Sequence, residues 1–309
     1  MAPILAAGSM DGKLPAGLRH VLAPNPSPLT AEGTNTWLLG EGTVAVIDPG
    51  PALPAHLEAI LFRLDPGEKI GQIIVTHAHR DHSGLAPILA ERTGAPVFAF
   101  GRALDGQREV ATRLAAPFAV AGEGVDETFV PDERLGDGRR LAGAGWEIEA
   151  IHTPGHLANH ICLAWGDLLF SGDHVMGWST SIVSPPEGDM GAYMESLARL
   201  SARRWSQMMP GHGEIVTDPS GRLAELTAHR RSREAQILSA LAGGPADTAT
   251  LTRRIYTDIS PALLPAAERN VIAHLVDLLE RKRVSVTPEA GTATAFALVS
   301  PPTSARPSS

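Results

Sequence analysis

The 309-residue sequence contains a single cysteine, Cys162, which excludes an internal disulfide. A lone cysteine is typical of proteins in a reducing compartment, and Cys162 lies in the apolar run "HICLAW", where we expect it to be buried. The amino terminus lacks a basic stretch before an apolar one, and no run approaches the ~18 apolar residues of a membrane span. We therefore expect a cytoplasmic protein without a signal peptide and without a membrane partner.

Aromatic residues are also scarce, at 5%, and the formal net charge is −8. Both features argue against general nucleic-acid binding, which favours basic surfaces and, for single strands, aromatic side chains that stack on bases. The charge is uneven, because residues 221–300 hold ten Lys/Arg and eight Asp/Glu, a net of +2, which leaves −10 for the remainder. This difference predicts that the acidic and the weakly basic parts are different domains.

Short apolar runs alternate with helical periodicities through the first two thirds of the chain. The first set of strand-like and helical segments comprises 34–40, 43–50, 54–64, 71–76, 85–92 and 95–100. A second set comprises 146–153, 160–165, 168–173, 189–202 and 205–213. This pattern predicts sheets covered by helices, arranged as a sandwich of two similar halves.

The character of the chain changes at about Pro219. Helical patterns at 221–241, 250–256 and 266–282 are followed by a β-prone segment with a glycine turn at 283–299. Three helices and a hairpin predict a winged-helix domain over residues 218–300. The Pro/Ser-rich tail, 301–309, is expected to be disordered.

The segment "THAHRDH", at residues 76–82, follows the apolar run "GQIIV" directly. In an extended chain that leaves a strand, His77 and His79 project to the same side. Asp81 and His82 follow where the chain turns into the next helix, so they can face a neighbouring point. Because imidazole and carboxylate groups bind borderline divalent metals, this strand end offers ligands for two adjacent ions.

Three further strand-like runs end in a glycine turn that carries a ligand-type residue. They are "AIHTPGH", "LLFSGD" and "MMPGHG", which contribute His156, Asp173 and His212. Glycine lets the backbone turn sharply and approach an ion closely. One such turn is a weak signal, but four strand ends of this kind in one chain predict a metal site.

These motifs, in this order, resemble those of the metallo-β-lactamase superfamily over residues 20–217. The resemblance implies an αββα sandwich, of the α/β (α+β) class, in residues 1–217. It also implies a dinuclear site, with His77, His79 and His156 for the first metal, Asp81, His82 and His212 for the second, and Asp173 as a bridge. Nitrogen-rich ligation favours Zn2+, and iron or manganese can also occupy His/carboxylate sites.

Charge arithmetic indicates what such a site would do. Two divalent ions bring +4 and two carboxylates −2, so a water between the ions would be present as hydroxide near neutral pH. We expect this metal-bridging hydroxide to be the nucleophile of a hydrolase. Asp81 and Asp173 are the expected catalytic carboxylates, since Asp81 would orient the hydroxide and Asp173 would bridge the ions.

Several polar residues near the motifs need separate interpretation. Asp48, in "IDPG", ends a strand beneath the site and resembles a superfamily position that supports a metal ligand from behind. His160 has two open interpretations, a supporting or substrate-contacting role and that of a plain structural histidine. His174 is expected to point away from the metals, and Tyr193, on an amphipathic helix, to pack in the core.

Over residues 20–300 the chain resembles the group around β-lactamase-like protein 2. The resemblance rests on "NTWLLG", "HTPGH", "LFSGDHVMG", "SPPEGDM" and the winged helix. This group includes metal-dependent endoribonucleases, so the resemblance implies cleavage of single-stranded RNA. The net charge of −10 outside residues 221–300 argues against a polyanionic substrate.

Three alternatives remain open. A glyoxalase II-like thioesterase would use the same hydroxide on a small acyl thioester. A mononuclear iron dioxygenase would share the first motif, whereas flavodiiron-type proteins carry glutamate at the position of His79. A sensor would use the winged helix to bind nucleic acid or a protein partner. The expected partners are thus a small ester or thioester or single-stranded RNA. If the winged helix binds no nucleic acid, we expect it to pack over the site and shape substrate entry, or to form a homodimer.

Overall fold

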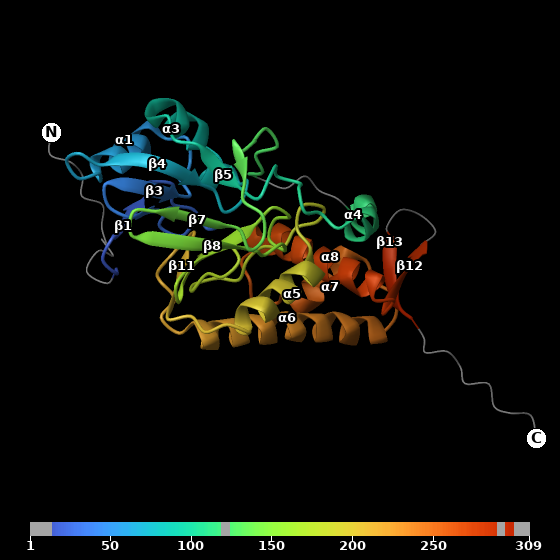
Figure 1. Ribbon diagram of the computed structural model, residues 1–309. Coiled ribbons are helices and arrows are strands. Elements are labelled where there is room, and N and C mark those ends of the chain that lie inside the picture. Colours follow the sequence, from blue (N-terminus) through green and yellow to red (C-terminus); the bar gives the residue numbers. More distant parts are fainter. Residues whose placement is uncertain (1–13, 119–123, 289–293, 300–309) are drawn as a thin grey trace, which may run out of the picture.

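The computed structural model describes residues 14–118, 124–288 and 294–299. Two sheets lie face to face in its amino-terminal part, and helices cover their outer faces (Figure 1). The chain therefore has the predicted mixed α/β class with a sandwich architecture. The tail expected to be disordered, 301–309, lies outside the described residues.

The first sheet has six strands in the order β1-β2-β3-β4-β5-β6. They are β1 (Leu18–Leu22), β2 (Asn35–Leu39), β3 (Thr43–Ile47), β4 (Lys69–Ile74), β5 (Val97–Ala99) and β6 (Glu133–Arg134). Strands β3 to β6 are parallel, and parallel neighbours need crossover connections. Helices α1 (Pro54–Phe62), α2 (Arg80–Ser83), α3 (Ala86–Thr93) and α4 (Glu109–Ala115) lie in these connections.

The second sheet has five strands in the order β11-β10-β9-β8-β7. They are β7 (Arg140–Gly143), β8 (Trp146–His152), β9 (Ile161–Trp165), β10 (Leu168–Gly172) and β11 (Gln207–Pro210). Only β10 and β11 pair in parallel within this sheet of the described chain, and α5 (Met190–Ser201) forms their crossover. Asp189 caps α5 by accepting a hydrogen bond from the Ala192 amide.

Side-chain alternation places one apolar layer between the sheets and one on each outer face. In β2, Trp37 and Leu39 face inward and pack with residues of the second sheet such as Phe170, whereas Leu38 faces outward. The outer face of the first sheet packs against α1 and α3. Cys162, on the outer face of the second sheet, is buried as predicted and packs with α5 and α6.

The carboxyl-terminal part consists of three helices and a two-stranded sheet. These are α6 (Pro219–Ala242), α7 (Thr248–Ile255), α8 (Leu264–Glu280), β12 (Val284–Pro288) and β13 (Thr294–Leu298). A 3-10 turn at Pro261–Leu263 precedes α8, and another at Ala116–Phe118 follows α4. Helix α8 has its own core with α6, α7 and the hairpin. It also packs on the sandwich through Ala273 and on α4 through Ile272. This double packing fixes α8 beside the sandwich, as Figure 1 shows.

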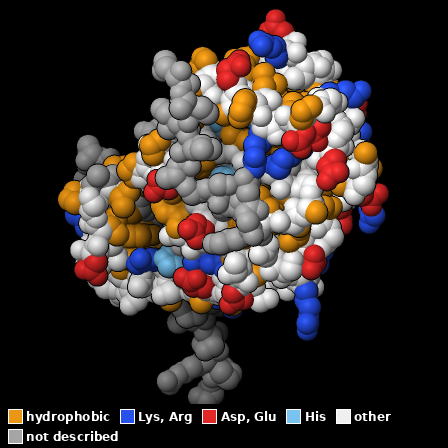
Figure 2. All heavy atoms as spheres, turned by 90° about the vertical axis from the view of Figure 1, so that its left-hand side faces the viewer, with side chains coloured by type: hydrophobic (Ala, Val, Ile, Leu, Met, Phe, Trp, Pro, Cys, Tyr) orange, Lys and Arg blue, Asp and Glu red, His pale blue; other side chains and the backbone are white. Residues whose placement is uncertain are grey.

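Across the described residues, no helix combines the length and the apolar character needed to cross a bilayer. Figure 2 shows one face of the molecule, on which acidic, basic and hydrophobic side chains are interspersed among the described residues.

Candidate metal centre

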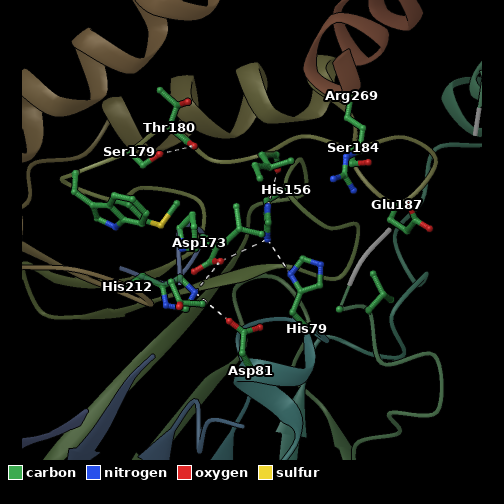
Figure 3. Close-up of a pocket in the computed structure, with 18 residues that line it drawn as sticks. His79, Asp81, His156, Asp173, Ser179, Thr180, Ser184, Glu187, His212 and Arg269 are labelled. Atoms are coloured by element: carbon green, nitrogen blue, oxygen red, sulfur yellow. Dashed lines mark hydrogen bonds and ion pairs between the residues drawn. The ribbon is translucent and has the colours of Figure 1, made fainter. Parts of the chain in front are cut away.

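Seven histidine and aspartate side chains from four strand ends converge at one edge of the sandwich. They are His77, His79, Asp81, His82, His156, Asp173 and His212. The first four follow β4, and the last three follow β8, β10 and β11. Figure 3 shows those that line a pocket there: His79, Asp81, His156, Asp173 and His212. The structure thus brings together every residue that the sequence analysis assigned to the metal site.

The segment after β4 owes its shape to the change from strand to helix. His79 keeps an extended backbone, with φ −84° and ψ 143°, and forms the N-cap of α2. His77 and His79 therefore project together from extended chain, whereas Asp81 and His82 lie on the short helix. One strand end consequently supplies side chains to two neighbouring clusters.

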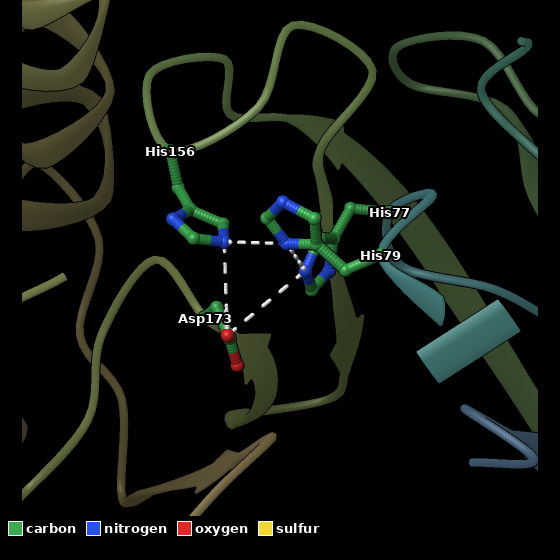
Figure 4. A group of neighbouring side chains, drawn as sticks. All are labelled: His77, His79, His156 and Asp173. Atoms are coloured by element: carbon green, nitrogen blue, oxygen red, sulfur yellow. Dashed lines mark hydrogen bonds and ion pairs between the residues drawn. The ribbon is translucent and has the colours of Figure 1, made fainter. Parts of the chain in front are cut away.

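The first cluster contains His77, His79, His156 and Asp173 (Figure 4). Nδ1 of His79 lies 2.9 Å from Nε2 of His77 and 3.0 Å from Nε2 of His156. Oδ2 of Asp173 lies 3.9 Å from Nε2 of His77 and 3.7 Å from Nε2 of His156. Donors that bind one zinc ion at about 2.0–2.2 Å lie roughly 3–4 Å from one another. These four atoms therefore have the spacing of a coordination shell.

The second cluster contains Asp81, His82 and His212. Nε2 of His212 lies 3.2 Å from Oδ2 of Asp81 and 3.3 Å from Nε2 of His82. Asp173 reaches this cluster as well, since its Oδ1 is 3.4 Å from His82 Nε2 and its Oδ2 is 3.4 Å from His212 Nε2. The Asp173 carboxylate thus lies between the two clusters.

Two further observations test whether the donors fit metal ions. Oδ1 of Asp173 is buried and has no hydrogen-bond partner among the described residues, which is costly unless a cation satisfies it. Gly211 packs so closely that an added Cβ would lie 2.4 Å from Asp173 Oδ1 and 2.5 Å from His82 Cε1. The close approach and the convergent donor atoms both fit divalent metal ions.

The electrostatics of the first cluster favour neutral histidines. Burial, reinforced by His156, lowers the pKa of His79 to about 3. Burial and the nearby His82 hold the pKa of His77 well below its usual value. Both rings are therefore neutral near pH 7 and can present nitrogen lone pairs to an ion.

The pKa values of the histidines in the second cluster are raised instead of lowered, because this cluster contains more carboxylate. Burial alone would lower the pKa of His212, but the charge of Asp173 raises it to about 9. For His82, Asp173 and Asp81 likewise overcome burial and raise the pKa well above its usual value. Without metal, protons on these histidines balance the buried carboxylates, and an incoming divalent cation would displace them.

Asp48 and His160 contact the donor residues from behind. Oδ2 of Asp48 lies 2.9 Å from Nδ1 of His82, and the same carboxylate accepts hydrogen bonds from the amide and hydroxyl of Thr76. Nε2 of His160 accepts a hydrogen bond from the Asp173 amide at 3.2 Å. Each contact orients a donor residue, as partners behind metal ligands commonly do.

Neither His174 nor Tyr193 lines the pocket over the donors. The two rings pack with centroids 4.5 Å apart, and both residues are buried. The Tyr193 hydroxyl donates a hydrogen bond to the carbonyl of His174 at 3.0 Å. Tyr193 therefore belongs to the core rather than to the pocket.

A pocket opens over the donors, and several of its wall residues gave no signal in the sequence. Its apolar side includes Leu29, Val125, Met176, Trp178 and Ile182. Ser184, Glu187 and Arg269 also line it, and Figure 3 shows Arg269 reaching in from the carboxyl-terminal helices. The segment 176–187, which follows Asp173, supplies one part of this wall, whereas only tertiary packing brings Leu29, Val125 and Arg269 to the site.

Comparison with known protein families agrees with this geometry. Residues 29–216 match the family described as "Metallo-beta-lactamase superfamily", and residues 248–292 match the "Beta-lactamase associated winged helix domain". The chain belongs to the metallo-β-lactamase superfamily of metal-dependent hydrolases. Its His/Asp clusters form the potential metal-binding site of that family, and α6 to β13 include the predicted winged helix.

Individual relatives of this superfamily member are similar over most of its length. A "Beta-lactamase-like protein 2 homolog" of Drosophila melanogaster is 31% identical over 292 residues, 90% of this chain and 93% of the relative. An "Atrochrysone carboxyl ACP thioesterase" of Aspergillus chevalieri is 30% identical over 226 residues, 72% of this chain and 65% of the relative. A β-lactamase domain protein from Burkholderia ambifaria has the same fold, with a TM-score of 0.79, 24% identity and 96% coverage of both chains.

Proposed function

We propose that this chain is a dinuclear hydrolase, with an ion in each of the two clusters. The observation that carries the proposal is the position of Asp173, whose two oxygens lie within 3.4 Å of His82 and His212 and whose Oδ2 also faces His77 and His156. The first ion would be held by His77, His79 and His156, the second by Asp81, His82 and His212, and both by Asp173. The high nitrogen content of this set favours zinc over magnesium or calcium.

Two bound ions would supply an acidified water as nucleophile and would polarise the carbonyl or phosphoryl group under attack. The residues of the chain would position this water and the group that it attacks. The Asp81 side chain is 29% exposed and that of Asp173 10%, so Asp81 is the carboxylate that the pocket can reach more readily. We assign to Asp81 the orientation of the attacking water and acceptance of a hydrogen bond from it.

The pocket wall supports a small acyl ester or thioester as the substrate. Its apolar side offers contacts to an acyl chain, and Arg269 is the one arginine or lysine among the described lining residues. A single-stranded RNA would need a longer basic track and stacking aromatics. The name of the Aspergillus chevalieri relative, a thioesterase, also supports a thioester substrate.

Cleavage of single-stranded RNA is the second candidate function. It is favoured by the similarity to the β-lactamase-like protein 2 homolog, which extends over 90% of this chain and includes the winged helix. In that case basic residues of α6 and α7 would have to guide the strand to the pocket.

A side-by-side assay tests the proposal. Zinc-loaded protein and protein treated with a chelator are each offered a butyryl thioester of N-acetylcysteamine and a fluorescent single-stranded RNA. We expect thioester hydrolysis that the chelator abolishes and added zinc restores. His79→Ala, purified in parallel, should lose this activity, which controls for contaminating enzymes. Chelator-sensitive cleavage of RNA alone would favour the second candidate, and chelator-insensitive turnover would contradict a metal hydrolase.

A further inference from the structure

Arg269 places a cation in the wall of the pocket that holds the metal donors. It lies in the second turn of α8 (Leu264–Glu280), and its side chain is half-buried. In Figure 3 it extends from the helix towards the side of the pocket formed by Ser184 and Glu187, near His156. A helix of the winged-helix region therefore contributes to the candidate active site.

The neighbouring residue fixes α8 to the pocket wall. Oδ1 of Asn270 accepts hydrogen bonds from the Val183 amide at 3.2 Å and from Arg230 Nη1 at 3.1 Å. Arg230 is 1% exposed and also donates to the carbonyl of Ser181. Because these bonds tie α6 and α8 to the segment that lines the pocket, the backbone that carries Arg269 is held in place.

The charge of Arg269 has no ion-pair partner among the described residues. Other arginines at the junction of α8 with its neighbours are paired. Arg108 binds Asp189 and Glu280, and Arg281 binds Asp277 and Glu234. The Glu187 carboxylate lines the same side of the pocket but forms no ion pair with Arg269. A guanidinium without an ion pair in a pocket wall can bind a carboxylate or a phosphate through two parallel N–H···O hydrogen bonds.

We propose that Arg269 binds an anionic group of the substrate, so that the enzyme selects esters or thioesters that carry a carboxylate or a phosphate. The inference rests on the hydrolase function proposed above and adds a specificity-determining residue to it. The apolar wall would hold the acyl chain, while Arg269 would fix the charged end and thus the position of the reacting carbonyl.

Two pairs of thioesters test this proposal and distinguish the two anions. Glutaryl- and pentanoyl-N-acetylcysteamine differ by a carboxylate on the acyl part, whereas butyryl-phosphopantetheine and butyryl-pantetheine differ by a phosphate on the thiol part. In at least one pair we expect kcat/KM to be roughly 10- to 100-fold higher for the charged member, the size of a charge-assisted hydrogen bond. Arg269→Gln should abolish this preference by lowering kcat/KM far more for the charged member than for the neutral one, and Arg269→Lys should retain part of it.

Arg254→Gln is the matched control, because Arg254 is an exposed arginine of α7 that does not line the pocket. It should leave the preference unchanged. Equal kcat/KM for both members of both pairs, or an equal loss for charged and neutral members in Arg269→Gln, would overturn the proposal.

Calorimetry of thioester binding to protein from which a chelator has removed the metal tests the Arg269 assignment separately from the hydrolase function. Wild type should bind the charged members about 10-fold or more tightly than Arg269→Gln does. If that difference appears without chelator-sensitive turnover, the hydrolase proposal fails and the anion site remains. If metal-dependent turnover occurs and Arg269→Gln binds the charged members as tightly as wild type, only the Arg269 assignment fails.

Discussion

Asp48 holds His82 in place from the side opposite the pocket, with 2.9 Å between Asp48 Oδ2 and His82 Nδ1. This contact directs Nε2 of His82 towards Asp173 and His212. Asp48 has a left-handed backbone, with φ 49°, and the hydrogen bonds from Thr76 stabilise it there. A carboxylate behind a ligating histidine fixes the ring and increases its basicity.

Asp48→Asn should therefore weaken metal binding in the second cluster while preserving the fold. Asparagine tolerates the left-handed region, but its single carbonyl oxygen cannot serve both Thr76 and His82. We expect a loss of about 10- to 100-fold in affinity for the second ion, measured by competition with a chromogenic chelator. Glu32→Gln, an exposed control, should bind like wild type. Unchanged affinity in Asp48→Asn would show that the contact does not tune the site.

Gly211→Ala tests the close approach of β11 to the donors. Its backbone is not left-handed, so the effect of a methyl group would come from its contact with Asp173 and His82. We expect the variant to bind less metal and to lose at least about 10-fold in kcat/KM, as for displaced supporting contacts. Gly136→Ala is the matched control, because its added Cβ would meet open space. Wild-type metal content and turnover in Gly211→Ala would show that the close packing of Gly211 against Asp173 and His82 is not needed for the site.

Metal removal should lower thermal stability, since ions that bind only the folded state stabilise it. At a free ion concentration 100 times Kd, the gain is about 2.7 kcal/mol per site, or several degrees in Tm. Differential scanning calorimetry with and without chelator measures it. Asp173→Ala should show a much smaller chelator effect than wild type, and an equal effect would place the stabilising ion elsewhere.

Tyr193→Phe tests whether Tyr193 has a structural role in the core or a role in the reaction. The variant loses the hydrogen bond to the His174 carbonyl, which should cost about 1 kcal/mol in the free energy of unfolding, measured by urea denaturation. Because Tyr193 does not line the pocket, kcat/KM and metal content should stay within about twofold of wild type. A loss of turnover at unchanged metal content would assign Tyr193 a role in the reaction.

The parts of the fold that carry the donors were predictable because each is a short apolar run that ends in a characteristic turn. Strands β4, β8, β10 and β11 end within four residues before His77, His156, Asp173 and His212, respectively. Short polar strands gave no comparable signal. Strand β7 reads "RLAG" and buries only Leu141, so its place in the sheet depends on pairing with β8.

The pocket wall was not predictable from the sequence in the same way. Helical periodicity placed residue 269 on a helix, but it could not show that α8 docks beside the metal donors. That docking depends on the hydrogen bonds of Asn270 with Val183 and Arg230, which lie 87 and 40 residues away in the sequence. Leu29 and Val125 likewise reach the pocket only through the folding of distant loops.

The measurement that tests the dinuclear assignment most directly is the metal content per chain, determined by elemental analysis after zinc loading and desalting. We expect two ions for wild type. We expect one ion for the variant with Asp81→Ala and His212→Ala together, because the first cluster keeps all four of its donors. One ion per chain in both proteins would contradict a dinuclear centre.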